Sequence, residues 1–239
     1  MIKIVSFKIC PFVQRVTALL EAKQLAYQVE YISLKDKPQW FLALSPNGQV
    51  PLLITEDGIA LFESEAIVEY INEVSRPLED NLTPEQKALD RAWGYMAAKH
   101  YLVQCGAMRS ADEDTLCERM TNLSKPFAKA EAELAKRENA SGHLFKGEQL
   151  SNVDIAWLPL LHRAQIIQQH TGFDLFANKP NVKAWQAALF ETGLFGKSVA
   201  DDFEEAFTGF YLSEQTYLGK GADCCKPSSP CNEDVSACC

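Results

Sequence analysis

The chain has 239 residues, of which 47% are hydrophobic and 23% charged, and its formal net charge is −9. The length is sufficient for two domains with their own cores, and the composition is that of an ordinary globular protein. The negative charge and the lack of a basic stripe argue against a nucleic-acid partner. The apolar runs are far shorter than a membrane span, and we read no secretory signal. We therefore expect a cytoplasmic protein with no membrane partner and with reduced cysteines.

The first third of the sequence alternates between patterns typical of strands and of helices. Apolar and β-branched runs predict strands over 2–7, 27–32, 50–54 and 59–62, and helical spacing predicts helices over 11–23, 38–44 and 64–74. The order βαβαββα joins a β-α-β unit to a hairpin and a further helix. It predicts an α/β domain with a mixed four-stranded sheet covered by helices. The right-handed crossover rule places the second strand beside the first.

The rest of the sequence is helical in pattern. Helices are predicted over 85–108, 112–137, 152–169, 180–190 and 200–212, and Ser151 with Asp154 forms a variant of the capping box before the third of them. We divide the chain into an α/β domain (1–78), a linker (79–88), an all-helical domain (89–218) and a tail (219–239). The tail is rich in Gly, Pro, Ser and Cys and too poor in apolar residues to order itself, so we expect it to be flexible.

Cys10 stands between a predicted strand and a predicted helix, and Pro11 follows it. Proline suits the first helical position, so Cys10 lies at a helix N-terminus, where free N–H groups and the helix dipole favour a thiolate. A Cys-x-x-Cys pair would indicate a dithiol oxidoreductase, but the fourth position is Val13. A single activated thiolate must exchange with an external thiol, and glutathione is the abundant one in the cytosol. The alternative is a buried structural cysteine.

Three further features suit the binding of a peptide with charged ends. If the bond before Pro51 is cis, the backbone of Val50 stays free to pair with an extended peptide; the alternative is a plain proline at a strand start. Ser64 opens a helix and can hold a carboxylate, and Glu63 can accept from an ammonium group, although such pairs are often only caps. Lys37, in a loop, could meet a distal carboxylate or could simply be solvated.

Taken together and in this order along the chain, these features resemble those of a known protein family. The sequence resembles the cytosolic glutathione transferases, and most closely the omega class, in residues 10–15 (CPFVQR), 35–41 (KDKPQWF), 49–53 (QVPLL) and 62–64 (FES). The resemblance continues through 151–154 (SNVD) and 185–188 (WQAA) to about residue 212. It implies the glutathione transferase fold, in which a thioredoxin-like domain is followed by an all-helical domain.

The resemblance also implies roles for individual residues. It implies that Cys10 is the catalytic residue, that the protein is a homodimer, and that a pocket for the second substrate lies between the domains. The glutathione contacts that it implies are Phe12, Lys37, Val50, Glu63 and Ser64. Three aromatic residues at four-residue spacing could line the second-substrate pocket from one helix face, or could pack in the core: Phe203, Phe207 and Tyr211.

The predicted function is that of a glutathione-dependent thiol transferase or reductase, acting in deglutathionylation or dehydroascorbate-type reduction. The Cys10 thiolate forms a mixed disulfide with glutathione as co-substrate, and no metal is required for catalysis. One alternative is a glutathione-transferase-like binding or regulatory protein without turnover. Another is soft-metal or metalloid handling by the tail, whose five cysteines could equally be incidental: Cys224, Cys225, Cys231, Cys238 and Cys239.

Overall fold

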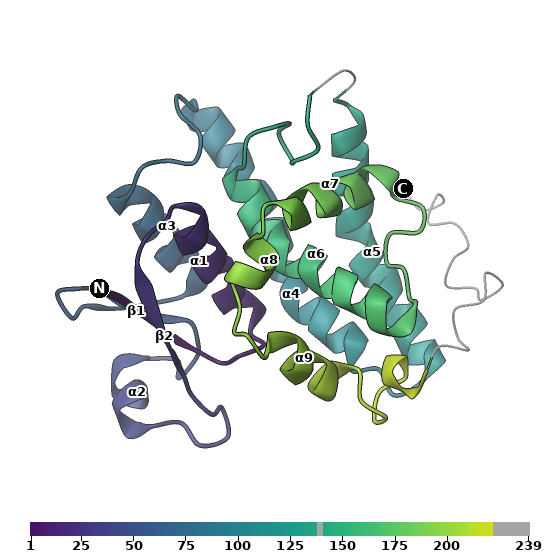
Figure 1. Cartoon of the computed structure of the whole chain (residues 1–239), viewed down its shortest axis with the longest axis horizontal. Coiled ribbons are helices and arrows are strands. Elements are labelled where there is room, and N and C mark those ends of the chain that lie inside the picture. The colour runs from purple at the N-terminus through teal and green to yellow at the C-terminus, as the bar shows by residue number, and fades with distance from the viewer. Residues whose placement is uncertain (138–140, 222–239) are drawn as a thin grey trace.

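Four short strands form one mixed sheet in the first third of the chain (Figure 1). The computed structural model describes residues 1–137 and 141–221. Strand β1 (Ile2–Ser6) pairs in parallel with β2 (Tyr27–Tyr31) and antiparallel with β3 (Leu52–Ile54), which pairs antiparallel with β4 (Ala60–Phe62). The order β2-β1-β3-β4 confirms the predicted α/β domain and the placement of the second strand beside the first.

Three helices connect and cover these strands in the predicted order βαβαββα. They are α1 (Pro11–Ala22), α2 (Gln39–Leu44) and α3 (Ser64–Val74). Helices α1 and α3 pack against each other. Val16 and Leu20 of α1, Ile67 of α3, and Ile4 and Leu53 of the sheet are completely buried in the same core. The helical spacing of the apolar residues therefore buries one face of each helix on the sheet.

The second part of the described chain is helical, as predicted. It contains α4 (Pro84–Met108), α5 (Glu113–Ala135), α6 (Asn152–Thr171), α7 (Pro180–Glu191), α8 (Leu194–Lys197) and α9 (Phe203–Tyr211), and ends in a short 3₁₀ turn, Leu218–Lys220. The sequence pattern does not predict α8. Together with the sheet domain, these helices confirm the glutathione transferase fold expected from the resemblance.

Helix α4 begins at Pro84, inside the segment 79–88 interpreted as a linker. The reason is a complete capping box: the Thr83 hydroxyl accepts from the Gln86 backbone N–H, and the Gln86 side chain accepts from the Thr83 N–H. The connection between α3 and α4 is therefore residues 75–83. The division of the chain into domains stays a prediction, and the tail lies outside the described residues from 222 onward.

Helix α6 holds the two parts of the molecule together. It packs against α1 of the sheet domain and against α4, α7 and α8 (Figure 1). A single cluster of buried hydrophobic residues extends from Ile4 in β1 through Val16 in α1 to Trp157 in α6. The start of α1 is consequently covered by side chains that lie about 150 residues further along the chain.

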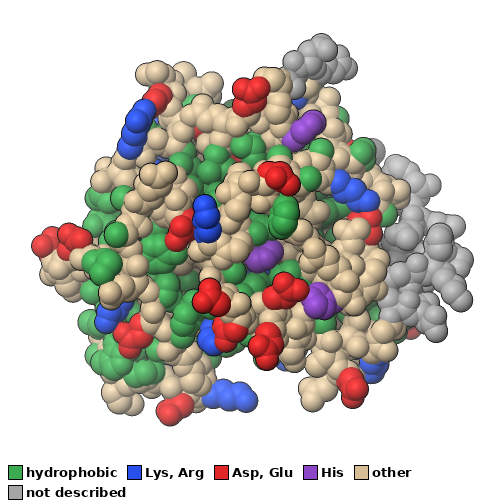
Figure 2. Space-filling view, in the orientation of Figure 1, with side chains coloured by type: hydrophobic (Ala, Val, Ile, Leu, Met, Phe, Trp, Pro, Cys, Tyr) green, Lys and Arg blue, Asp and Glu red, His purple; other side chains and the backbone are tan. Residues whose placement is uncertain are grey.

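The surface carries charges of both signs. On the face in Figure 2, Lys and Arg side chains are scattered among Asp and Glu side chains, with hydrophobic atoms between them. Within residues 1–137 and 141–221, no helix has the length and apolarity needed to cross a membrane.

Candidate active site

Cys10 is a free, partly buried thiol at the N-cap of α1. Its backbone is extended, its N–H donates to the Phe7 carbonyl at 3.0 Å, and its carbonyl accepts from the Gln14 N–H at 3.1 Å. Pro11 occupies the first helical position, where a missing N–H leaves no hydrogen bond unmade. The structure thus places Cys10 at the helix start where the sequence predicts it.

Two opposing effects act on the pKa of the Cys10 thiol. The N–H groups of Phe12 and Val13 and the Arg163 guanidinium all lower the pKa of the Cys10 thiol, as a helix N-terminus should. Burial nevertheless raises this pKa, and burial is the larger effect. The stabilising effect that was predicted for the helix start is therefore present, burial acts against it, and the role of the Cys10 thiolate stays a prediction. Sequence periodicity placed the helix dipole correctly but gave no measure of how much protein covers the sulfur.

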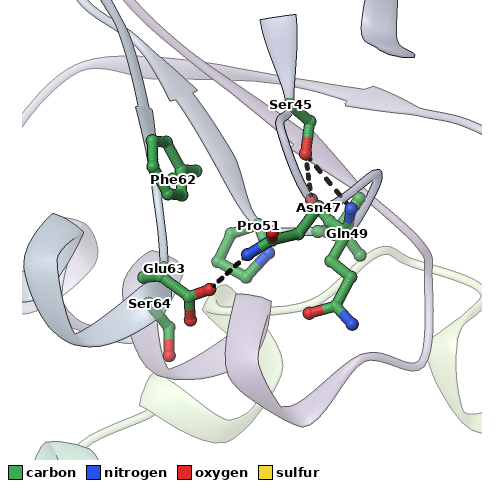
Figure 3. A pocket seen from close by; sticks show the side chains of 8 residues that line it. Ser45, Asn47, Gln49, Pro51, Phe62, Glu63 and Ser64 are labelled. Atoms are coloured by element: carbon green, nitrogen blue, oxygen red, sulfur yellow. Dashed lines mark hydrogen bonds between the residues drawn. The ribbon is translucent and has the colours of Figure 1, made fainter.

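Figure 3 shows a small cavity, of about 40 Å³, at the edge of the sheet domain. The loop after α2, the start of β3 and the junction of β4 with α3 form its wall. It is lined by Ser45, Asn47, Gln49, Val50, Pro51, Phe62, Glu63 and Ser64. The bond between Val50 and Pro51 is cis. Three of the predicted contact residues, Val50, Glu63 and Ser64, therefore line one cavity.

Glu63 and Ser64 are adjacent and have opposite hydrogen-bonding roles: Glu63 accepts, whereas Ser64 and the helix start can donate. The Glu63 carboxylate accepts from Asn47 Nδ2 at 2.8 Å (Figure 3), and its remaining acceptor capacity suits an ammonium group. Ser64 is buried and is the first residue of α3, so its hydroxyl and the nearby N–H groups suit a carboxylate. Asn47, which anchors Glu63 from the facing loop, was missed because the Asn47-Gly48 pair is also an ordinary turn signal.

Lys37 and Phe12, the other two predicted contact residues, do not line this cavity and already have partners. Lys37 Nζ donates to the Gly48 carbonyl at 2.8 Å, in the loop that leads into the cavity wall. The half-buried Phe12 ring packs edge-on against Tyr101 of α4, with 5.1 Å between the ring centroids. Their predicted contacts with glutathione stay predictions.

The three aromatic residues of α9 are buried. Phe203, Phe207 and Tyr211 follow one another along one helix face, with centroid distances of 5.8 Å and 5.1 Å between successive rings. They belong to a hydrophobic cluster with Ile9 and Cys105. In this structure they act as core residues, and their predicted contact with a second substrate stays a prediction.

The candidate metal ligands of the tail, from Cys224 to Cys239, lie outside the described residues. In the part of the chain that the structure does describe, no group of three or more His, Cys, Asp or Glu side chains is arranged to hold a metal ion.

A buried polar network, which the sequence did not predict, joins α1 to α6 next to Cys10. Arg163 Nη1 donates to Gln14 Oε1. Because arginine can only donate, the Gln14 oxygen must face Arg163, so its nitrogen faces His162 Nδ1 at 2.8 Å. His162 Nδ1 therefore accepts and carries no proton. Gln14 Nε2 also approaches Ser198 Oγ, before α9, at 3.2 Å.

His162 should make the fold sensitive to acid. It stacks between Phe195 and Phe203, and burial and the Arg163 charge lower its pKa to about 3. An unfolded histidine titrates near 6.5, so between these values only the unfolded chain binds this proton, and stability falls as the pH falls. Between pH 7.5 and 5 the loss from this group is about 2 kcal/mol.

We expect His162→Phe, which keeps the stacking and cannot titrate, to remove that part of the pH dependence. The free energy of unfolding in urea should fall by about 2 kcal/mol less between pH 7.5 and 5 in the variant than in the wild type. The comparison uses the change in the free energy of unfolding with pH within each protein, so a general loss of stability in the variant does not affect the result. Parallel pH profiles would show that His162 is not the acid-sensitive group.

Comparison with known proteins matches both parts of the chain to one family. The glutathione S-transferase N-terminal domain matches residues 9–74, and the glutathione S-transferase C-terminal domain matches residues 95–195. Glutathione S-transferase omega-1 of Sus scrofa is 30% identical over 194 residues, which cover 80% of this chain and 77% of that protein. Glutathione S-transferase DHAR2 of Arabidopsis thaliana is 29% identical over 192 residues, covering 80% of this chain and 84% of that protein.

The crystal structure of glutathione transferase Omega 3C from Trametes versicolor has the same fold, with a TM-score of 0.69 and 24% identity over 84% of this chain and 89% of that one. The chain belongs to the glutathione transferase family. The resemblance to the omega class is confirmed, and the relatives also include dehydroascorbate reductases.

Proposed function

We propose that this protein is a glutathione-dependent thiol transferase and reductase whose reacting group is the Cys10 thiol. The observation that carries the proposal is the position of a free cysteine at the N-terminus of α1, in the same domain as the cavity lined by Glu63 and Ser64. Relatives of the omega class and of the dehydroascorbate reductases support it. The site gives no support to the alternative of a binding protein without turnover, because the thiol that turnover needs is present.

The proposed reaction has two exchange steps. The Cys10 thiolate attacks the glutathione sulfur of a mixed disulfide, a Cys10–glutathione disulfide forms, and the substrate thiol leaves as a thiolate and takes up a proton. A second glutathione thiolate then attacks the same sulfur, which gives oxidised glutathione and releases the Cys10 thiolate. Val13 stands where a resolving cysteine would be, so the second thiol comes from solution. Reduction of dehydroascorbate likewise takes two electrons from two glutathione molecules.

In the proposed binding mode, the site contacts glutathione along its whole length. Glu63 accepts from the ammonium group of the γ-glutamyl residue, and Ser64 with the start of α3 holds the adjacent carboxylate. The Val50 backbone pairs with the cysteinyl residue, and Lys37 binds the glycine carboxylate. Phe12 contacts the peptide from the start of α1. The shared cavity of Val50, Glu63 and Ser64 supports this arrangement.

We expect Glu63→Gln to weaken glutathione binding about tenfold, because a charge-assisted hydrogen bond to the ammonium group becomes a neutral one. Glutamine can still accept from Asn47, so the melting temperature should change little. Isothermal titration with reduced glutathione measures the affinity. Glu69→Gln, on the same helix and paired with Arg91, is the control and should bind normally. Unchanged affinity together with a lower melting temperature in Glu63→Gln would make Glu63 a purely structural residue.

The function itself is tested by incubating the protein with oxidised glutathione and mapping the adduct by peptide mass. Mapping is essential because the chain has eight cysteines. The proposal requires a glutathionyl group on Cys10 that reduced glutathione removes, and steady turnover in a glutathione:disulfide exchange assay. Adducts only on other cysteines, with no turnover, would instead support the binding-protein alternative.

We also propose a homodimer, a cytoplasmic location and catalysis without a metal. The first two follow the resemblance to the cytosolic glutathione transferases. Sedimentation of the purified protein tests the oligomeric state, and exchange activity in the presence of a strong chelator tests the metal independence.

A further inference from the structure

Arg163, in the middle of α6, is a fully buried cation. Its guanidinium donates to the Pro159 carbonyl at 3.0 Å, to the Ile9 carbonyl at 3.1 Å and to Gln14 Oε1, while its Nε has no hydrogen-bond partner. Among residues 1–137 and 141–221, no carboxylate forms an ion pair with it. A buried charge without an opposite charge is costly, so the surroundings favour any anion that forms close to it.

The groups acting on Arg163 that can become anions are two thiols and two phenols: Cys10, Cys105, Tyr101 and Tyr211. Burial raises the pKa of both tyrosines, so they stay protonated. Cys105 is buried and meets the Tyr211 hydroxyl. Cys10 is therefore the group near Arg163 that combines partial exposure, a position at a helix start and the ability to become an anion.

The other ionisable groups near Cys10 supply no competing cation. His162, on α6, stays neutral because its pKa is lowered to about 3. Lys8, in the loop before Cys10, pairs with Asp202 at the surface and lies over the Tyr31 ring at 5.9 Å. Arg163 is thus a buried positive charge close to the chain at Cys10, because its guanidinium binds the carbonyl of the residue before Cys10.

Arg163 also holds the backbone on both sides of Cys10. The Ile9 carbonyl that it binds belongs to the residue before the thiol, and the Gln14 side chain that it binds lies one turn after it. The Gln14 N–H closes this turn on the Cys10 carbonyl. The faces of Phe203 and Phe207 cover the guanidinium, with 5.4 Å and 5.9 Å to the ring centroids, and keep water away from it.

We propose that Arg163 is the positioning residue for Cys10, and that its buried charge stabilises the Cys10 thiolate each time that anion forms. The inference rests on the proposed function for its role in turnover. In the first step the thiolate is the nucleophile. In the second step the bond between Cys10 and glutathione breaks, the electron pair goes to the Cys10 sulfur, and Arg163 stabilises the leaving group.

The test is the pH dependence of alkylation of Cys10 by iodoacetamide, followed by peptide mass in the wild type and in Arg163→Met. We expect the midpoint of the plot of alkylation rate against pH to lie at least one pH unit higher in Arg163→Met than in the wild type. At pH about 7.5, alkylation of the variant should therefore be about tenfold slower. Arg163→Lys keeps the charge but not the fork of donors. It should keep a midpoint near that of the wild type while the exchange rate falls, because positioning is lost.

The matched control is Arg15→Met. Arg15 is also a buried arginine of the domain junction, but it pairs with Glu65 of α3, and it should affect stability without moving the midpoint. If Arg163→Met does not fold, Arg163→Gln supplies the neutral variant. An unmoved midpoint in the neutral variant, or an equal shift in Arg15→Met, would overturn the inference. Because alkylation needs no turnover, a protein that lacks exchange activity but shows the shift would contradict the proposed function alone.

Discussion

Replacing Cys10 by serine is expected to reduce glutathione:disulfide exchange at least a hundredfold. A serine hydroxyl is not ionised near neutral pH and cannot form a disulfide, so neither exchange step is available to it. Serine has nearly the same shape and is a better N-cap than cysteine, so α1 should be at least as stable as before. The loss is measured by the exchange rate, alongside the melting temperature, which should not fall.

A control variant distinguishes the contribution of Cys10 from that of the tail cysteines. A variant with all five tail cysteines, from Cys224 to Cys239, replaced by serine should exchange within a few-fold of the wild type. In the wild type, the rate should continue to rise with pH beyond the ordinary thiol range, because burial raises the pKa of Cys10 and the thiolate forms only at higher pH. Retention of more than a tenth of the activity by Cys10→Ser would place the chemistry elsewhere.

The elements of the sheet domain follow from local sequence, because each of them has a signal within a few residues. Pro11 fixes the start of α1, the Asp57-Gly58 turn separates β3 from β4, and Ser64 opens α3. Chain order and the handedness of the crossover then leave few ways to arrange the strands. Helix α8 escaped prediction because four residues are too few to show a helical period.

The candidate site was predictable where its residues carry their own local signal, as Cys10, Glu63 and Ser64 do. It was not predictable where the effect depends on residues far along the chain. Arg163 and Gln14 are 149 residues apart, and no periodicity or motif brings them together. The covering of the start of α1 by α6 and α9 also determines how far the Cys10 thiol is buried. The helix N-terminus alone therefore accounts for the effects that lower the pKa of Cys10, and the burial that raises it could not be inferred from the local sequence.

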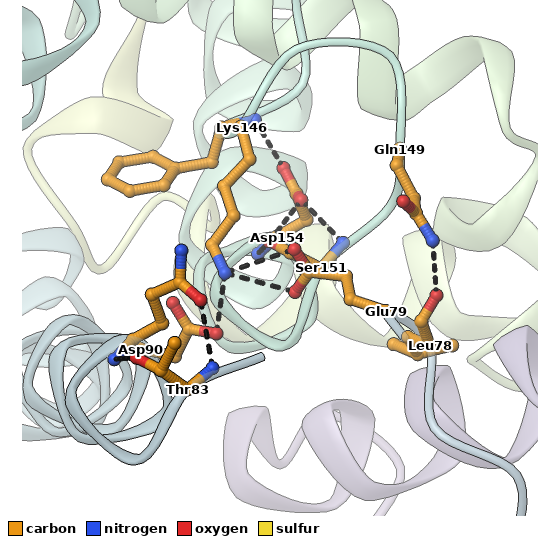
Figure 4. Close-up of polar contacts among 10 residues, drawn as sticks. Leu78, Glu79, Thr83, Asp90, Lys146, Gln149, Ser151 and Asp154 are labelled. Atoms are coloured by element: carbon orange, nitrogen blue, oxygen red, sulfur yellow. Dashed lines mark hydrogen bonds and ion pairs between the residues drawn. The ribbon is translucent and has the colours of Figure 1, made fainter. Parts of the chain in front are cut away.

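Asp154 anchors the start of α6 and is fully buried (Figure 4). Its carboxylate accepts hydrogen bonds from the Ser151 N–H at 2.8 Å and the Ser151 hydroxyl at 2.6 Å, as the capping box predicts. It also accepts from the Phe145 N–H at 2.8 Å and from Trp185 Nε1 at 2.6 Å. One side chain therefore joins the loop before α6 and helix α7 to the first turn of α6. Burial raises the pKa of Asp154, and these donors oppose the rise.

We expect Asp154→Ala to lower the free energy of unfolding by about 3–5 kcal/mol, because four donors lose a charged acceptor inside the protein. For a chain of this size, the corresponding fall in melting temperature is roughly 6–20 °C. Asp154→Asn keeps one acceptor oxygen and should lose less. Urea unfolding at neutral pH measures the three proteins under the same conditions.

Asp112→Ala is the control, because the Asp112 carboxylate also accepts a backbone hydrogen bond at a helix start, there as the N-cap of α5. Its carboxylate accepts from the Thr115 N–H at 2.8 Å at the start of α5, but it is exposed. Loss of such a cap costs about 1 kcal/mol. The excess cost at Asp154 then measures the contribution of the Phe145 and Trp185 hydrogen bonds, which tie α6 to its neighbours. If the two alanine variants lost the same stability, Asp154 would be an ordinary helix cap, and the packing of α6 against α1 would have to come from its apolar contacts alone.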